Sequence, residues 1–295
     1  EMKKKHNIPF IFDMRGFWAD ERVDGGIWNL KNPVFRLVYN FFKKKELEFC
    51  KNADAIISLT YAGINEMKTW NVSGILAKTH IIPCAVDTDL FSQSKIIEKE
   101  AEELKKQIFP LGSKVLLYSG SLGTWYLLKE MLIFFEKLEE NDASWYFLFL
   151  TRDTENLQAE LKNLSPEKRM KIKFLEVKRN EIPRYITMAD FTIFFIVPKF
   201  SKKSSFPTKH AEFMAMGKPS IANSNVGDVE AIINDSKSGV VLNSFSEAEI
   251  ENKVLEMLNF NGNNHEISEF AEKQFSLSSA VAKYQSIYSS ILREK

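Results

Sequence analysis

The chain has 295 residues, of which 44% are hydrophobic and 13% aromatic, enough apolar material for more than one buried core. Its 40 basic and 39 acidic residues leave a formal charge of +1, so no overall field favours a polyanion and we expect no nucleic-acid partner. The longest apolar runs, residues 145–150 and 191–197, are far shorter than the roughly 20 residues that cross a bilayer. The sequence therefore predicts no transmembrane helix.

Two cysteines, Cys50 and Cys84, are too few for a disulfide framework, and both lie in apolar stretches where a free thiol behaves as a small hydrophobe. They indicate a reducing, cytoplasmic compartment. The chain begins at Glu1, without an initiator methionine or a signal-peptide pattern, and reaches a strand-like run almost at once. We therefore expect a fragment that lacks its natural N-terminus.

Short apolar runs rich in Val, Ile and Phe alternate with longer amphipathic stretches. Nine such runs predict strands, at residues 8–12, 55–59, 80–82, 114–118, 145–150, 172–175, 191–197, 219–222 and 239–242. Continuous apolar character is typical of strands buried on both faces, and alternation with helices is typical of a parallel sheet. The sequence therefore predicts an α/β fold.

A turn, a charged segment and Pro110-Leu111-Gly112 separate the third predicted strand from the fourth, and we place a domain boundary there, near residue 107. Six of the nine predicted strands follow it, enough for a complete doubly wound domain. We expect two Rossmann-like domains, an incomplete one at residues 1–106 and a complete one at 107–275. A final helix, 276–295, should pack on a domain surface, with crossing back to the first domain as one option.

Residues 204–220 are typical of a loop, a short helix and the entry to a strand. Ser205 is the candidate N-cap, and Pro207 falls in the first turn. A helix start offers unpaired backbone N–H groups and the positive end of a dipole, to which Thr208 adds a hydroxyl and Lys209 a full charge. This combination predicts a diphosphate site.

Glu212 lies close to one turn after Lys209, and its carboxylate can accept two hydrogen bonds from vicinal hydroxyls such as those of ribose. Phosphate and ribose would then be recognised side by side. The competing interpretation is an ordinary surface Lys–Glu pair, worth about 0.2–0.5 kcal/mol. The residues alone leave both interpretations open.

The strand at 114–118 is followed by Ser119-Gly120-Ser121-Leu122-Gly123-Thr124 and then by a helical pattern. Glycines at a strand-to-helix turn let the backbone approach a ligand closely, and the hydroxyls supply donors. Plain turn chemistry is the alternative. The loop is not a P-loop, because no Gly-Lys-Ser/Thr follows.

Two further segments follow strands at the carboxyl edge, where open α/β sheets bind ligands. The backbone of Val177 and Lys178 would hold the edge of a nucleobase, unless the run 177–183 is an ordinary charged connection. In the second segment, Gly227 permits a close turn, and Asp228 is expected to cap the next helix.

Asp13 and Arg15 follow the first predicted strand. Arg15 could clamp an anion and Asp13 orient a hydroxyl, although a buried Asp–Arg pair that fixes the loop is the favoured interpretation. The aromatic Trp18 and Trp28, with the run 41–45, would touch a membrane surface or an acceptor, or else belong to a partly buried helix. Four scattered histidines form no zinc pattern, so we expect no metal site.

As a set, these residues resemble the family of GT-B-fold, retaining glycosyltransferases that use nucleotide sugars, the family-4 type. The resemblance runs from about Ile8 to Leu292 and rests on the order and spacing of several modest motifs. They are residues 53–60 (ADAIISLT), 81–91 (IIPCAVDTDLF), the loop 118–123, Glu181-Ile182-Pro183 ahead of Ala189-Asp190, and 212–219 (EFMAMGKP).

The resemblance implies that the second domain binds the donor and the first the acceptor. Glu212 matches the second glutamate of the family's E-x7-E element, which holds the ribose, whereas the first glutamate falls at Ser204. The Ser-Phe-Pro-Thr-Lys variant would substitute for it, with Lys209 neutralising the diphosphate. Lys129 is the nearest match to a basic residue that follows the glycine loop. The expected donor-binding residues are Gly120, Ser121, Gly123, Thr124, Lys129, Val177, Lys178, Ser204, Ser205, Pro207, Thr208 and Glu212, and the expected catalytic residues are Lys209, Asp13 and Arg15 at the interdomain cleft.

The implied activity is transfer of a sugar from a nucleoside-diphosphate sugar to a hydroxyl, driven by electrostatic stabilisation, without a metal or a cofactor beyond the donor. The resemblance also implies a saccharide or lipid-linked saccharide acceptor from surface polysaccharide synthesis, and a cytoplasmic place with peripheral contact to the inner face of the cell membrane as an option. Two other interpretations stay open. One is a catalytically silent sugar-nucleotide-binding module, motivated by Ser204, and the other is a GT-B-fold epimerase with additional cleft carboxylates.

Overall fold

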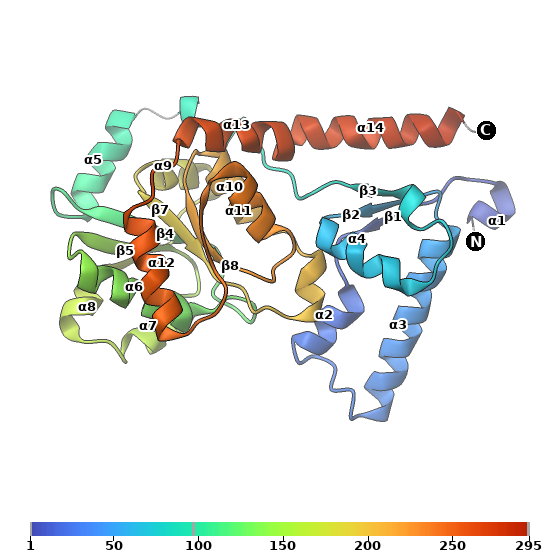
Figure 1. The fold of residues 1–295 in the computed structure, drawn as a ribbon, viewed down its shortest axis with the longest axis horizontal. Coiled ribbons are helices and arrows are strands. Elements are labelled where there is room, and N and C mark those ends of the chain that lie inside the picture. Colours follow the sequence, from blue (N-terminus) through green and yellow to red (C-terminus); the bar gives the residue numbers. More distant parts are fainter. Residues whose placement is uncertain (1, 96–97, 294–295) are drawn as a thin grey trace.

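A computed structural model describes residues 2–95 and 98–293, and Figure 1 shows them as two lobes side by side, each built around its own sheet. The described residues form nine strands, all paired in parallel. They lie at the nine places that the apolar runs indicate. The ends differ by up to three residues, because the first strand begins at Ile11 rather than Ile8.

The smaller domain holds a three-stranded sheet in the order β1-β2-β3. Its strands are β1 (Ile11–Met14), β2 (Ala55–Ser58) and β3 (Thr79–Ile81). Ile56 and Ile57, which are fully buried, point to opposite faces of β2 and join two separate apolar clusters. The sheet is therefore covered on both sides, as the continuous apolar runs predict.

The larger domain holds a six-stranded sheet in the order β6-β5-β4-β7-β8-β9. Its strands are β4 (Lys114–Ser119), β5 (Trp145–Leu150), β6 (Ile172–Leu175), β7 (Phe191–Phe194), β8 (Ser220–Asn223) and β9 (Gly239–Leu242). The chain winds outward from β4 on one side and then returns to wind outward through β7 on the other. The gap between the carboxyl ends of β4 and β7 is thus the switch point where doubly wound sheets bind ligands.

Helices cover both sheets. In the smaller domain they are α1 (Met2–His6), α2 (Trp18–Asp24), α3 (Pro33–Asn52) and α4 (Tyr61–Met67), with the short 3-10 turns η1 (Lys68–Trp70) and η2 (Leu76–Lys78). A further turn, η3 (Gln93–Lys95), lies in the connection that leads into the larger domain. In the larger domain they are α5 (Glu98–Ile108), α6 (Leu128–Asn141), α7 (Thr154–Leu161), α8 (Pro166–Met170), η4 (Arg179–Glu181), α9 (Ile182–Thr187), η5 (Phe200–Ser204), α10 (Thr208–Ala215), α11 (Val229–Ser236), α12 (Glu247–Leu258) and α13 (Asn264–Phe275).

Helix α5 packs on the larger domain, although the predicted boundary near residue 107 assigns it to the smaller one. Ala101 is buried in the larger core, with Leu104 and Ile108 packed against it, and Phe91 ahead of the helix belongs to the same core. We therefore propose a boundary before Phe91, because the apolar face of α5 is covered by the second domain.

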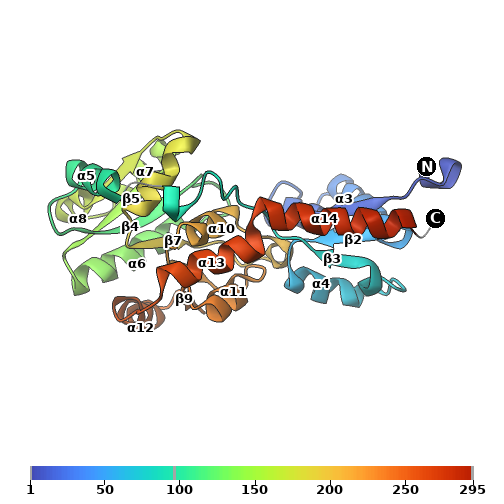
Figure 2. The same ribbon diagram turned by 90° about the horizontal axis from the view of Figure 1, so that it is seen from above.

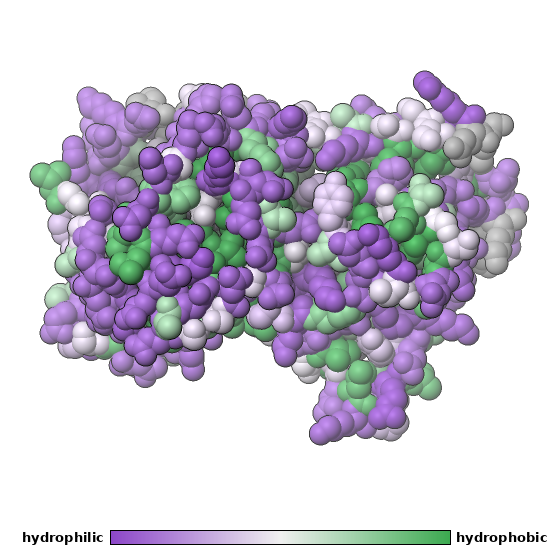
Figure 3. All heavy atoms as spheres, viewed as in Figure 1, coloured by the Kyte–Doolittle hydropathy of each residue, from purple (hydrophilic) through white to green (hydrophobic). Residues whose placement is uncertain are grey.

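The last helix, α14 (Leu277–Arg293), runs from the larger domain across the smaller one, as Figure 2 shows from above. Ile287 is buried against Ile57 and Ile82, with Tyr284 and Ile291 packed beside it. Within the described residues, no helix is long and apolar enough to cross a membrane. At the lower tip of the smaller domain, where α2 ends and α3 begins, Figure 3 shows apolar side chains among hydrophilic ones.

Candidate functional site

The start of α10 differs in one respect from the prediction. The helix begins at Thr208, and Pro207 rather than Ser205 occupies the N-cap position, without a side-chain cap. Ser205 lies ahead of this position and ends η5 instead, where its N–H is bonded to the carbonyl of Lys202. The first turn of α10 therefore keeps uncapped backbone donors at the positive end of its dipole.

Lys209, in this first turn, points its ammonium into a pair of tyrosine rings. Its Nζ lies 4.1 Å from the ring centre of Tyr118 and 3.7 Å from that of Tyr126, and it donates to Tyr118 Oη at 3.0 Å. Burial lowers the pKa of Lys209 to about 7, an effect that the charge of Glu212 partly opposes. Without an anion beside it, the side chain therefore loses its charge more readily than an exposed lysine does.

Gly120 ends β4 directly beside this ammonium. Its φ of +131° is one that side-chain-bearing residues rarely adopt, and a Cβ there would lie 2.6 Å from Lys209 Nζ. The absence of a side chain at Gly120 therefore lets the Lys209 ammonium approach the end of β4 closely. Ser121 follows, and its carbonyl accepts a hydrogen bond from Tyr118 Oη, which ties the loop to the lysine.

Glu212 is half of an ion pair that the sequence did not indicate. Its Oε1 accepts from an Arg179 nitrogen at 2.9 Å, and Arg179 also lies over the ring of Phe91 at 5.2 Å. Burial raises the pKa of Glu212, while the Arg179 charge opposes that rise. Arg179 lies in the charged run 177–183, for which the sequence predicts a role of the backbone. The basic side chain in this run is the feature that could have indicated a partner for Glu212.

A pocket of about 350 Å³ lies at the carboxyl edge of the larger sheet, on the β6 side of the switch point. The residues that line it come from the carboxyl ends of β4, β5 and β6: Ser119, Gly120, Ser121, Leu150, Thr151, Arg152, Asp153, Val177, Arg179 and Ile182. Gly120 lies beside Lys209 Nζ, and Arg179 forms an ion pair with Glu212, so both α10 side chains lie next to this pocket without lining it. The predicted Gly120, Ser121 and Val177 are therefore brought together with Lys209 and Glu212.

Other expected donor residues lie elsewhere. Lys129 is exposed on α6, where it faces Glu160 at 3.7 Å, because the first turn of the helix directs it away from the loop. Lys178 is exposed, and its N–H is bonded to Glu181 as a cap of η4. Gly123 and Thr124 are exposed in the loop. None of these lines the 350 Å³ pocket.

Ser204, the position of the missing glutamate, faces the smaller domain. It is buried, and its Oγ accepts a hydrogen bond from the Phe17 N–H at 2.8 Å. The same short segment makes further links to that domain, among them Lys202 to Glu21 at 2.7 Å and Thr60 Oγ1 to the carbonyl of Lys203 at 2.7 Å. Segment η5 is thus the main polar joint between the domains.

Asp228 is a second joint, and the expectation for it was wrong. It makes no side-chain cap on α11; instead its carboxylate accepts from the N–H groups of Tyr61 and Ala62 at 2.6 and 2.9 Å. It therefore caps α4 in the other domain. Sequence proximity indicated the helix that follows Asp228, whereas packing presents a different helix start to it.

Asp13 and Arg15 line a separate pocket of about 420 Å³ within the smaller domain. Arg15 Nε lies 3.4 Å from Asp13 Oδ2, and Tyr284 of α14 donates to Asp13 at 3.1 Å. The Arg15 side chain is 65% exposed, so the favoured interpretation of a buried pair was wrong. The structure does not bring these two residues into the pocket that Lys209 borders.

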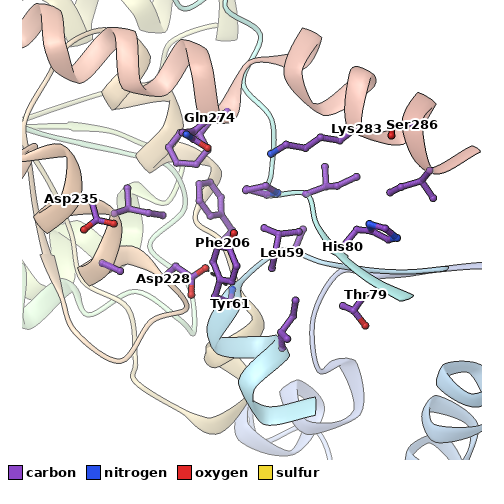
Figure 4. Close-up of a pocket in the computed structure, with 18 of the residues that line it drawn as sticks. Leu59, Tyr61, Thr79, His80, Phe206, Asp228, Asp235, Gln274, Lys283 and Ser286 are labelled. Atoms are coloured by element: carbon purple, nitrogen blue, oxygen red, sulfur yellow. Dashed lines mark hydrogen bonds between the residues drawn. The ribbon is translucent and has the colours of Figure 1, made fainter. Parts of the chain in front are cut away.

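A larger pocket, of about 910 Å³, lies between the domains beneath α13 and α14. Figure 4 shows Phe206 and Leu59 facing it, with Lys283 extending from α14 toward it. It contains no residue that the motifs indicate as a donor ligand. Volume alone therefore does not identify the site, and the combination of helix start, glycine turn and buried charge favours the 350 Å³ pocket beside the switch point. Within the described residues, no group of three or more His, Cys, Asp or Glu could hold a metal ion.

The fold is a two-domain, doubly wound α/β architecture, and the sequence identifies the family. The sequence model of glycosyl transferases group 1 matches residues 99–274. Because this match spans more than half of the 295 residues, the chain belongs to that family. A search of curated proteins finds no match.

Solved structures share the fold at low sequence identity. HepE from Anabaena, in complex with UDP and glucose, has a TM-score of 0.70 and 14% identity over 98% of this chain and 73% of its own. Sucrose-phosphate synthase from Thermosynechococcus elongatus has a TM-score of 0.71 and 16% identity, over 100% of this chain and 70% of its own. A glycosyltransferase from Rickettsia africae has a TM-score of 0.70 and 18% identity, over 87% and 68% respectively. These likenesses establish the two-domain GT-B architecture.

Proposed function

We propose that the chain transfers a sugar from a nucleoside-diphosphate sugar to a hydroxyl acceptor, with the diphosphate at the Gly120 loop and the start of α10. The observation that carries this proposal is the ammonium of Lys209 beside Gly120, which is buried at an uncapped helix start and has no ion-pair partner among the described residues. The crystallised HepE, which shares the fold, holds UDP and glucose, and this supports a nucleoside diphosphate as the ligand.

In this arrangement Lys209 and the first N–H groups of α10 stabilise the charge that develops on the departing diphosphate. The Glu212 carboxylate accepts hydrogen bonds from the ribose hydroxyls, and its ion pair with Arg179 is then either kept alongside them or broken. The backbone at Val177, which lines the pocket, holds the base, whereas both backbone groups of Lys178 are already bonded to Glu181. No cofactor or metal is needed beyond the donor, because fixed protein charges do the electrostatic work that a metal would otherwise supply.

The acceptor is proposed to enter from the smaller domain. Asp13 and Arg15 line the 420 Å³ pocket there, and Trp18 lies in the same lining. A carboxylate, a guanidinium and an aromatic face suit a saccharide, whether free or linked to a lipid. A cytoplasmic place at the inner face of the membrane would suit the lipid-linked case.

Calorimetric titration with UDP and with GDP tests the donor site. Lys209→Met and Glu212→Ala should each weaken binding about ten- to hundredfold, since each removes a charge-assisted hydrogen bond worth about 1.5–3 kcal/mol. Lys106→Met, which removes an exposed lysine from α5, is the matched control and should bind like the wild type. Unchanged affinity in both site variants would reject the proposed position of the diphosphate.

One observation favours a second function, a sugar-nucleotide-binding module without turnover. The side chain at position 204 is a serine turned toward Phe17, so the carboxylate of the E-x7-E element is absent. Release of UDP from UDP-glucose or GDP from GDP-mannose, measured with and without added saccharides, separates the two. Tight binding without release would favour the module, and sustained release would favour the transferase.

A further inference from the structure

The ammonium of Lys209 lies between two aromatic rings that come from separate elements. Tyr118 belongs to β4 and is fully buried, and Tyr126 lies in the loop before α6. A bridge to Ile196 and a hydrogen bond from the Tyr126 N–H to the Gly123 carbonyl hold the second ring in place. Both rings are therefore fixed by the backbone rather than by the lysine.

The hydrogen bonding around Tyr118 has a definite direction. Its hydroxyl proton goes to the carbonyl of Ser121, so the oxygen offers a lone pair to Lys209 at 3.0 Å. An ammonium has three N–H donors, and within the described residues this is the one acceptor bonded to it. Two donors thus remain for a ligand at the Gly120 loop.

Few charged groups face this ammonium. Glu212 lies on the same helix but is paired with Arg179 of η4. Asp153, ahead of α7, accepts the N–H of Leu122 at 2.6 Å and lies near Tyr118 rather than near the lysine. The titratable groups that touch Nζ are the two tyrosines, and burial raises the pKa of both, so both stay neutral.

We propose that Tyr118 and Tyr126 are positioning residues, which favour the charged form of Lys209 and aim it at the diphosphate of the donor. The electron-rich ring faces attract the cation in its buried position, so they partly replace a counter-ion without competing for the ligand. A carboxylate in their place would neutralise the lysine and repel the phosphate. This inference rests on the proposed function, because the diphosphate is the anion that completes the site.

The effect of losing a tyrosine ring on nucleotide affinity should depend on pH, and this dependence separates an effect of charge from an effect of shape. At pH 8 the free lysine is mostly neutral, whereas the nucleotide complex requires the cation, so loss of a ring weakens binding. At pH 6 the free lysine is already charged, and the ring then stabilises free and bound forms alike. An effect of shape alone would weaken binding equally at both values.

The test compares Tyr126→Leu, which removes the ring, with Tyr126→Phe, which keeps it. Calorimetry with UDP and GDP should show roughly tenfold weaker binding for Tyr126→Leu at pH 8 and about a twofold change at pH 6. Tyr126→Phe should match the wild type at both values. Ratios to the wild type at each pH cancel the titration of the nucleotide itself.

A second measurement does not require nucleotide. In NMR titrations with carbon-labelled lysine, assigned by the resonance that Lys209→Met loses, the titration midpoint should fall by about one pH unit in Tyr126→Leu and stay in place in Tyr126→Phe. If the Leu variant does not fold, a fluorinated phenylalanine at position 126 keeps the shape, depletes the ring face and should shift the midpoint in the same direction.

The outcomes are distinct. An unmoved midpoint, or equal weakening at pH 6 and pH 8, overturns the role of the tyrosines. If instead neither nucleotide binds the wild-type chain while the midpoint moves as expected, the rings hold the charge but the proposed donor site fails.

Discussion

Nucleotide binding should take up a proton from solvent above pH 7. Burial places the pKa of Lys209 at about 7, so at pH 8 roughly nine tenths of the free molecules carry a neutral amine. A diphosphate beside Nζ favours the charged form and raises that pKa. The sign follows directly: this group leaves the affinity unchanged below about pH 6, and the affinity falls as pH rises through 7.

Calorimetry at pH 8 in two buffers of different ionisation enthalpy counts these protons. The wild type should take up roughly 0.9 proton per nucleotide, since the phosphates of UDP are already deprotonated at this pH. Lys209→Met should take up almost none, and Lys106→Met should behave like the wild type. Intact binding whose heat does not depend on the buffer would refute the contact between Lys209 and the diphosphate.

Three further variants test the structure by thermal and urea unfolding. Asp228→Ala leaves the Tyr61 and Ala62 N–H groups without their acceptor and should cost about 2–4 kcal/mol, and a loss below about 0.5 kcal/mol would contradict the cap across the domains. His210→Leu should stabilise the folded chain by about 1 kcal/mol, because both buried ring nitrogens have no hydrogen-bond partner among the described residues. Burial also lowers the pKa of His210 to about 3, so the ring is neutral, and a fall in Tm would count against this prediction. Gly120→Ala should cost about 1–3 kcal/mol and weaken nucleotide binding, whereas Gly123→Ala, with open space and an ordinary φ, should leave stability unchanged; equal effects would argue against strain at Gly120.

The architecture could be predicted from the sequence because buried parallel strands are recognisable as short, continuous apolar runs. Runs such as 145–150 are apolar at every position, since helices cover both faces of the sheet. The switch point then follows from the strand order, and with it the neighbourhood of Gly120 and Lys209. These features need only local pattern and the rules of doubly wound sheets.

Side-chain partners were less accessible, because they depend on packing between distant segments. Tyr118 and Lys209 are 91 residues apart, and Asp228 and Tyr61 are 167 apart. Lys129 illustrates the opposite error: it is close to the glycine loop in sequence, but the start of α6 at Leu128 directs it to Glu160. Proximity along the chain predicts neighbours only until a helix sets the direction of each side chain.

The serine at position 204 has a physical explanation in the joint between the domains. It is 3% exposed, and its Cβ lies 3.2 Å from where a Cβ on Gly63 would stand, so the space suits a small side chain. A glutamate there would bury a charge in a joint that now receives the Phe17 N–H. Because only residues 205–208 separate Ser204 from Lys209, the domain contact and the proposed donor site share one short segment, and a carboxylate at 204 would have to displace the joint to reach the donor.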